Sequence, residues 1–296
     1  MKLLTPQSEA YLDTINKFKQ SKKGIAHFNI SNLEQARAIC EVASELNQPV
    51  IIGVSENERK HIGTEMVRKL VDELNQEYDT QIFLNADHTY TFEDVVKVTE
   101  AGYDSVIVDA TKLPYEENVA FVRKCVDFIR NYETKTGKRV LVEAELGYIG
   151  QSSTLNEEIP DGVKEENLTT KEQAKDFILR TGIDMFAPAV GNIHGMMING
   201  PEPALRIDKI KDISESVDAP LVLHGASGNT DEDLKNAVNA GVTIIHINTE
   251  IRKAFRDAER DYMNEHPNDV ALYKIGTVAE DEMKKVVRAK MEIYIN

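Results

Sequence analysis

The sequence is short of positive charge. Its 296 residues carry a formal net charge of −15, and no cluster of Lys and Arg interrupts the acidic excess. A surface of this kind repels phosphate backbones, so nucleic acid is not an expected partner. An anionic substrate would therefore need groups that hold it locally.

Long apolar runs and cysteines are also scarce. No stretch approaches the ~18 apolar residues that a membrane span requires, and the N-terminal segment lacks the apolar core of a signal peptide. We therefore expect a cytoplasmic protein with no membrane partner. The only cysteines, Cys40 and Cys125, lie among apolar neighbours in predicted helices, and we expect both to be buried packing residues without chemistry.

Eight short runs rich in Val and Ile are typical of strands buried on both faces. They span residues 24–30, 49–55, 81–87, 105–110, 139–145, 185–190, 219–225 and 243–249. Segments with helical periodicity separate them, and three of these segments end at a glycine just before the next strand, at Gly102, Gly182 and Gly241. Such alternation implies right-handed crossovers and a parallel sheet. At this length, an α/β fold of the closed (β/α)8 TIM barrel type is the simplest arrangement, and an open doubly wound sheet is the alternative.

The chain shows no linker or composition break, so we expect residues 1–296 to form a single barrel domain. Additional helices are expected at both ends, over about residues 5–21 and about residues 257–296. The long polar connection from Gly147 to Thr170 is either a disordered insertion or a lid over a site. Capping boxes predict helix starts at Ser31, Thr91, Thr169 and Thr230.

In a barrel of this type, the functional site lies at the carboxyl ends of the strands. The polar residues at those ends are Asn29, Ser55, Asp87, His88, Asp109, Glu143, Glu145, His194, His224 and Asn248. Three histidines from different strands would thus converge beside carboxylates. Neutral imidazoles can supply three ligands of a tetrahedral Zn²⁺ site and leave the fourth position open. The sequence therefore predicts a divalent metal site at this rim.

A phosphate site is predicted next to the metal. The turn "HGASGN", residues 224–229, follows the seventh strand, and "NTE", residues 248–250, follows the eighth. Backbone N–H groups at these two positions form the usual phosphate cradle of a barrel. Such a cradle would let an acidic protein bind a phosphate.

Nearly the whole chain resembles the class II, zinc-dependent ketose-bisphosphate aldolases, a family that includes fructose-bisphosphate and tagatose-bisphosphate aldolases. The segments that carry the resemblance are, in order, "HFNISNLEQARAICEVASELNQPVIIGVS", "NADHTYTFEDV", "DSVIVDATKLPYEENVAFVRKCVDF", "VLVEAELGYIG", "AVGNIHG", "LVLHGASG", "INTEIRKAF" and "LYKIGTVAEDEMKKVVRAKM". The resemblance implies a lyase of carbohydrate metabolism that cleaves and forms a carbon–carbon bond of a phosphorylated ketose. The reaction would pass through the enediolate of dihydroxyacetone phosphate.

The resemblance also implies roles for individual residues. It makes Asp87 the proton donor to the aldehyde oxygen. Metal ligands would be His88, His194 and His224, with Glu145 as an additional ligand. Contacts with the sugar phosphate would come from Asn29, Ser55, Gly195, Gly225, Ser227, His246, Asn248 and Thr249. The implied cofactors are Zn²⁺ or another divalent metal and a monovalent cation, Na⁺ or K⁺, and the implied assembly is a homodimer or homotetramer.

Several positions depart from the family's pattern. Where its loop after "ELG" usually continues to Gly-Gly-x-Glu-Asp, this chain has Gly150-Gln151-Ser152-Ser153, so the acid that handles the proton on the enediolate carbon is missing there. Glu157 or Glu158 is the nearest replacement. Ile198 stands where many members have a phosphate-binding lysine.

Another departure is His246, which replaces an asparagine that contacts the bound ketose. Because side chains alternate along a strand, His246 and Asn248 face the same way, and we expect His246 to point into the pocket. Thr89 and Ala226 replace common glycines and are expected to crowd the site.

These departures leave the aldehyde half of the substrate open, and with it whether the substrate is a bisphosphate. They also leave two other functions open. One is a related metal-assisted proton transfer, such as an epimerisation or dehydration, and the other is a non-catalytic barrel that binds a sugar phosphate.

Overall fold

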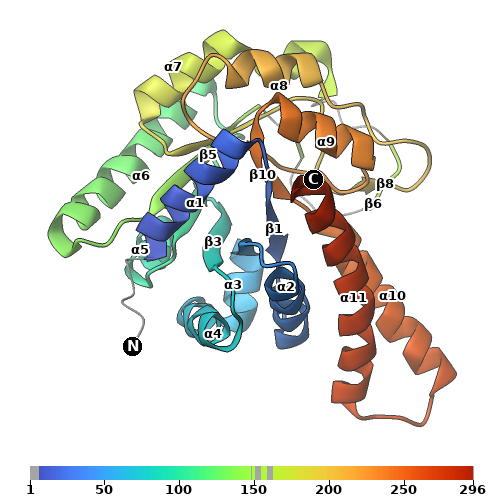
Figure 1. Ribbon diagram of the computed structural model, residues 1–296. Coiled ribbons are helices and arrows are strands. Elements are labelled where there is room, and N and C mark those ends of the chain that lie inside the picture. The colour runs from blue at the N-terminus through green and yellow to red at the C-terminus, as the bar shows by residue number, and fades with distance from the viewer. Residues whose placement is uncertain (1–6, 148, 151–154, 159–162, 296) are drawn as a thin grey trace.

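The computed structural model describes residues 7–147, 149–150, 155–158 and 163–295, with the backbone alone for residues 7 and 8. Eight parallel strands close into a barrel in the order β1-β10-β9-β7-β5-β4-β3-β2 (Figure 1). They are β1 (Ile25–Asn29), β2 (Val50–Val54), β3 (Ile82–Thr89), β4 (Ser105–Val108), β5 (Leu141–Leu146), β7 (Met185–Pro188), β9 (Leu221–Leu223) and β10 (Val242–His246). The predicted (β/α)8 TIM barrel is confirmed, and each strand overlaps one of the eight predicted runs.

Helices cover the outside of the barrel. Between the barrel strands lie α2 (Leu33–Glu45), α3 (Glu56–Ile62), α4 (Thr64–Glu77), α5 (Phe92–Glu100), α6 (Tyr115–Thr136), α7 (Lys171–Thr181), α8 (Ile207–Ser214) and α9 (Asp231–Ala240). The apolar outer faces of the strands and the inner faces of these helices form one large core, which includes the free thiols of Cys40 and Cys125. Helices α5, α7 and α9 end at the predicted glycines, which all have positive φ.

Two of the four predicted helix starts are correct and two are wrong by one residue. The hydroxyls of Thr91 and Thr230 accept the expected backbone hydrogen bonds at the starts of α5 and α9. Helix α2 is instead capped by Asn32 and helix α7 by Thr170. The neighbouring hydroxyls have other partners, because Ser31 donates to Glu58 and Thr169 donates to the backbone oxygen of Leu146.

The barrel has a second, smaller core inside it. Apolar side chains from the first half of the strands form a layer across the interior, and helix α1 (Gln7–Ser21) closes the barrel below that layer. The ring of Tyr11 stacks on Phe83 with 4.4 Å between centroids, and Ile15 is fully buried in the same cluster. This layer consists of Ile25, Ile51, Phe83, Leu141, Met185, Ala187, Val222 and Ile244. In the part of the chain that the structure describes, this layer and α1 fill one end of the barrel, and its carboxyl-terminal rim is the end left for ligands.

The ends of the chain form additional helices, as predicted. Residues 5 and 6 of the predicted N-terminal helix and residue 296 of the C-terminal extension lie outside the described residues. The C-terminal extension consists of the second half of α10 (Thr249–Glu265) and the whole of α11 (Leu272–Ile295). The two helices pack side by side and project from the barrel (Figure 1). In the part of the chain that the structure describes, no helix combines the length and apolar character needed to cross a bilayer.

The long connection between β5 and α7 has local structure that the sequence did not predict. Its strand β6 (Leu155–Asn156) pairs in parallel with β8 (Met196–Met197), and a 3₁₀ turn forms at Glu165–Asn167. Residues 151–154 and 159–162 of the connection, with the Gln151-Ser152-Ser153 segment, Pro160 and Gly162, lie outside the described residues. The described part is therefore held beside the segment that follows His194.

Candidate active site

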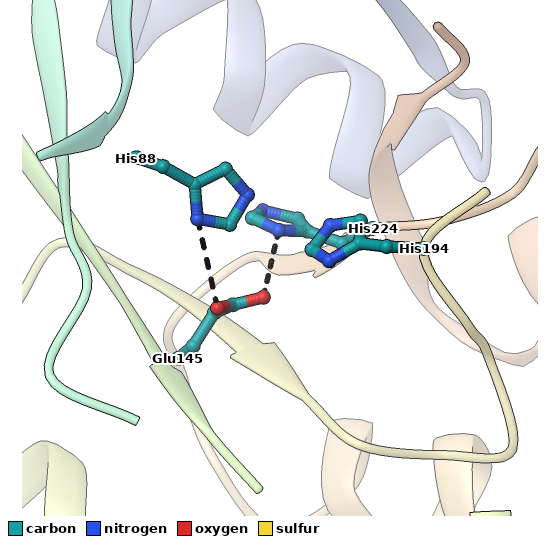
Figure 2. A group of neighbouring side chains, drawn as sticks. All are labelled: His88, Glu145, His194 and His224. Carbon is teal, nitrogen blue, oxygen red and sulfur yellow. Dashed lines mark ion pairs between the residues drawn. The ribbon is translucent and has the colours of Figure 1, made fainter. Parts of the chain in front are cut away.

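Three histidines and one glutamate meet at the carboxyl-terminal rim of the barrel (Figure 2). His88 lies at the carboxyl end of β3, Glu145 in β5, His194 in the connection between β7 and β8, and His224 directly after β9. One nitrogen from each ring and one oxygen of Glu145 all lie within 4.8 Å of one another. The predicted convergence of these four side chains is therefore present in the structure.

The backbone of His88 is unusual for a strand residue. Its φ is +39°, in a region that L-residues rarely occupy, and the pairing of β3 with β4 shifts register between Ala86 and Thr89. The irregularity turns the end of β3, so that the ring of His88 faces those of His194 and His224 at centroid distances of 5.0 and 5.2 Å. Strained backbone of this kind concentrates at functional sites.

Among the described residues, each of the three rings has a hydrogen-bond partner on one nitrogen only. Nδ1 of His88 lies 2.9 Å from Oδ2 of Asp109, Nδ1 of His194 lies 2.7 Å from the backbone oxygen of Gly150, and Nε2 of His224 lies 2.6 Å from Oε1 of Glu143. These partners fix the ring orientations. They leave Nε2 of His88, Nε2 of His194 and Nδ1 of His224 for another ligand, as in the carboxylate–histidine–metal arrangements of known metal sites.

Glu145 completes the group. Its Oε1 lies 2.8 Å from Nδ1 of His224, without the orientation of a hydrogen bond, and its Oε2 lies 3.9 Å from Nδ1 of His88 (Figure 2). All four side chains are buried or nearly so. Three imidazole nitrogens and one carboxylate oxygen are a donor set that suits a divalent transition metal, above all Zn²⁺. The residues present therefore fit such an ion.

The electrostatics at His88 and His224 favour added positive charge. Burial alone lowers the pKa of His88, but the carboxylates of Asp87, Asp109 and Glu145 outweigh it and raise that pKa to about 9. Likewise, burial opposes protonation of His224, yet Glu145 and Glu143 raise its pKa well above the ordinary value. A divalent cation would satisfy the same carboxylates.

Asp87 lies beside the cluster but has a different environment. Its Oδ2 accepts a hydrogen bond of 2.7 Å from Nδ2 of Asn29, whereas its Oδ1 is buried and has no hydrogen-bond partner within the described parts of the chain. The same Oδ1 lies 3.9 Å from Nε2 of His88 and 3.9 Å from Nδ1 of His246. Although burial alone raises the pKa of Asp87, the charge of His88 and the hydrogen bond from Asn29 hold that pKa below its ordinary value. Asp87 is therefore an ionised carboxylate with one free acceptor oxygen.

The predicted phosphate-binding residues line a small cavity of about 20 Å³ next to the cluster, a volume for about one water molecule. Its walls are formed by Asp87, His88, His194, Gly195, Gly225, Ser227, His246, Asn248 and Thr249. Gly225 allows its turn to lie close to the segment that carries His194, because a Cβ there would lie 2.1 Å from the backbone oxygen of Ile193. The N–H groups of Asn248 and Thr249 already donate to Oγ of Ser227.

A larger cavity of about 370 Å³ is also lined by Asp87 and His88. Asn29 and Ser55 line it, as predicted, although the hydroxyl of Ser55 also caps helix α3. The sequence analysis missed Arg252, which lines the same cavity from α10 and forms an ion pair of 2.6 Å with Glu58. Its position, three residues after Thr249 on a helix that begins at the rim, was the available signal.

Four departures from the family's pattern are resolved by the structure. His246 lines the small cavity, as expected. The side chains of Thr89 and Ala226 do not crowd the site, contrary to expectation. Oγ1 of Thr89 accepts a hydrogen bond from Arg59, and Ala226 packs in the large core between the strands and the helices. Ile198 is 48% exposed and lines neither cavity.

Comparison with known proteins agrees with this geometry. Residues 9–296 match the family model for fructose-bisphosphate aldolase class-II. Among solved structures, the chain is similar to the YdjI aldolase from Escherichia coli K12, with 27% identity, a TM-score of 0.80 and coverage of 96% of each chain. It shares its fold with a fructose-bisphosphate aldolase from Campylobacter jejuni, with 20% identity, a TM-score of 0.78 and coverage of 98% of this chain and 95% of the other.

Proposed function

Because the chain belongs to the class-II fructose-bisphosphate aldolase family, we propose that it cleaves and forms a phosphorylated ketose by a reversible aldol reaction through the enediolate of dihydroxyacetone phosphate. The observation that best supports this proposal is the free Oδ1 of Asp87, buried beside the cluster of His88, His194, His224 and Glu145. A buried carboxylate oxygen without a partner is costly, and a substrate hydroxyl would satisfy it.

The cluster of three histidines and Glu145 would hold the divalent cation, with Zn²⁺ as the ion that best suits these donors. When bound, the cation would act as a Lewis acid toward a ketone oxygen and stabilise the negative charge that develops on that oxygen. Asp109, Glu143 and the backbone oxygen of Gly150 hold the rings in place for it. A monovalent cation near the phosphate is also part of the proposal.

Asp87 would move the hydroxyl proton. In the cleavage direction, its Oδ1 accepts the proton of the hydroxyl group whose carbon becomes the aldehyde, and in condensation it returns that proton. The lowered pKa keeps Asp87 in the basic form that cleavage requires. Asn29 binds the other oxygen and so orients the carboxylate.

Each of the two cavities would bind one half of the substrate. Gly195, Gly225, Ser227 and Thr249 would receive the phosphate of the three-carbon half at the small cavity, with His246 and Asn248 close to its reacting end. Because that cavity holds about one water molecule, it has to open as the phosphate enters. The aldehyde half would lie in the larger cavity, which also contains Ser55.

Arg252 indicates the kind of aldehyde that this cavity suits. It is a guanidinium group on the wall of the larger cavity, and its ion pair with Glu58 leaves part of the side chain exposed. We therefore propose an aldehyde with an acidic or phosphorylated end. Such an aldehyde would make the condensation product a ketose with two anionic ends.

The proton on the enediolate carbon needs a second group. We propose Glu157 or Glu158 for this role, since both lie on the connection that pairs beside His194. Their side chains are exposed, so the connection would have to fold over the substrate.

The proposal is tested with the metal-loaded protein and dihydroxyacetone phosphate in D₂O. We expect NMR to show exchange of a C–H proton, followed by formation of a ketose when aldehydes with and without an anionic end are added. His224→Asn should lose both metal and exchange, whereas His61→Asn, which changes an exposed histidine in α3, should retain both. A metal-loaded protein that catalyses neither exchange nor condensation would refute the proposal.

A further inference from the structure

A second pair of histidines lies in the barrel interior next to the cluster. His27 in β1 and His246 in β10 are partners in the barrel's strand register, and their rings stack with centroids 3.5 Å apart and planes 4° from parallel. The other side of the His246 ring faces His224, at 4.2 Å and 22°. The three rings therefore form a column that runs from the strand β1 to the cluster.

The surroundings of His27 are shaped to hold its ring. A Cβ on Gly53 of β2 would lie 2.2 Å from Cε1 of His27, so a glycine is needed for the ring to occupy this place. Nε2 of His27 lies 3.2 Å from Oδ1 of Asn85, whose amide nitrogen donates to Ser105 at 2.7 Å. The amide orientation requires His27 to carry its proton on Nε2.

The column is not a second metal site, although nitrogens of His27 and His246 lie within 4.8 Å of an oxygen of Asp87. A metal ion binds imidazole nitrogen in the plane of the ring, and two parallel planes 3.5 Å apart cannot share one ion. Burial lowers the pKa of His27 to about 4 and that of His246 well below its ordinary value. Two neutral rings can stack without repulsion.

The ring of His246 carries a nitrogen that has no hydrogen-bond partner among the described residues. Nε2 of His246 is buried without a hydrogen bond, and the ring lines the small cavity with Gly225 and Ser227. A neutral imidazole nitrogen is a directional group, so its use to a substrate oxygen depends on the angle of the ring. The flat surface against the far side of that ring is the ring of His27.

We infer that His27 is a positioning residue that fixes the ring of His246 by stacking, so that Nε2 of His246 meets an oxygen of the bound substrate. The inference rests on the proposed aldolase function. His27 itself lines neither the small nor the large cavity, so it acts through His246 and not by contact with the substrate.

Two substitutions separate stacking from hydrogen bonding at this position. His27→Gln keeps an amide for Asn85 but removes the ring, and His27→Phe keeps a flat ring but removes the hydrogen bond. Loss of one aromatic stack is expected to lower kcat/KM by about threefold to tenfold in His27→Gln, while His27→Phe stays within about twofold of the wild type. Bound metal should remain at the wild-type stoichiometry in both. If His27→Gln does not fold, His27→Leu replaces it as the apolar variant without a flat ring.

A double-mutant cycle with His246→Asn provides the second measurement. If His27 acts through His246, the loss caused by His27→Gln should disappear in the His246→Asn background. A loss of equal size in both backgrounds, or greater activity in His27→Gln than in His27→Phe, would overturn the inference. Failure of the proposed function would be distinguishable, because the wild-type protein would then show neither cleavage nor exchange.

Discussion

Replacement of Asp87 by asparagine separates the hydroxyl proton from the rest of the proposed reaction. The amide has the volume of the carboxylate, and its oxygen can still accept the bond that Asn29 donates to Oδ2. Its nitrogen then takes the place of Oδ1, so a donor stands where the substrate hydroxyl needs an acceptor. Loss of a positioned general base costs about 10²- to 10⁴-fold in rate, which is about 2.7 to 5.4 kcal/mol of activation free energy. We expect kcat for cleavage to fall by that factor in Asp87→Asn.

The same variant should keep two other properties. Metal affinity is expected to change little, because Asp87 is not one of the four grouped donors and lies 3.9 Å from Nε2 of His88. Exchange of the C–H proton of dihydroxyacetone phosphate with D₂O should also continue, because that step does not use the hydroxyl of the aldehyde half. The assays are steady-state cleavage, metal analysis after dialysis, and NMR of the exchange.

Asp212→Asn is a matched control, because Asp212 is an exposed acid on helix α8. It should leave all three measurements unchanged. Cleavage by Asp87→Asn within about threefold of the wild type, with metal bound, would refute the role of Asp87. Loss of metal together with activity would show instead that Asp87 supports the metal site.

Four further predictions concern the metal site, the barrel interior and the substrate. Glu143→Gln removes the charge that faces Nε2 of one ligand ring at 2.6 Å, and metal affinity measured by chelator competition should fall by about 10- to 100-fold. In metal-free protein, the pKa of His88 is raised to about 9, so its protonation stabilises the folded state fully at pH values below the unfolded pKa of about 6.5. The melting temperature should therefore decrease as the pH rises from about 6.5 through about 9, and it should change less over this range in His88→Asn. Gly53→Ala places a methyl group against the ring of His27 and should destabilise the fold by about 1 to 3 kcal/mol, measured by urea unfolding. Arg252→Ala should raise KM for an anionic aldehyde and leave KM for a neutral aldehyde unchanged.

The barrel and most of its rim could be predicted from the sequence. Buried parallel strands have continuous apolar runs, so their number and their carboxyl ends can be located without knowing the register. His88 and His224 follow such runs directly, and the barrel topology alone brings them to one rim. The helix starts predicted at Ser31 and Thr169 were wrong by one residue, because two adjacent residues could each cap the helix. Tertiary hydrogen bonds of Ser31 and Thr169 decide which residue does so.

Other features depend on contacts that no local pattern encodes. The stack of His27 on His246 joins the first and last strands, so it exists only once the barrel closes. In sequence, His27 is an isolated histidine inside an apolar run, and Gly53 has no visible relation to it. The two-residue pairing of β6 with β8 is equally invisible, because segments so short carry no strand signal of their own.

Helix α1 has a consequence for the order in which the protein folds. It precedes all eight barrel strands in the chain, yet its buried side chains pack on the interior layer that includes Ile244 of the last barrel strand, β10. The helix cannot reach its final place until β10 has left the ribosome, and contacts of such large sequence separation form slowly. During synthesis its apolar face stays exposed, so a nascent chain that stalls before β10 should be a target for chaperones and proteases.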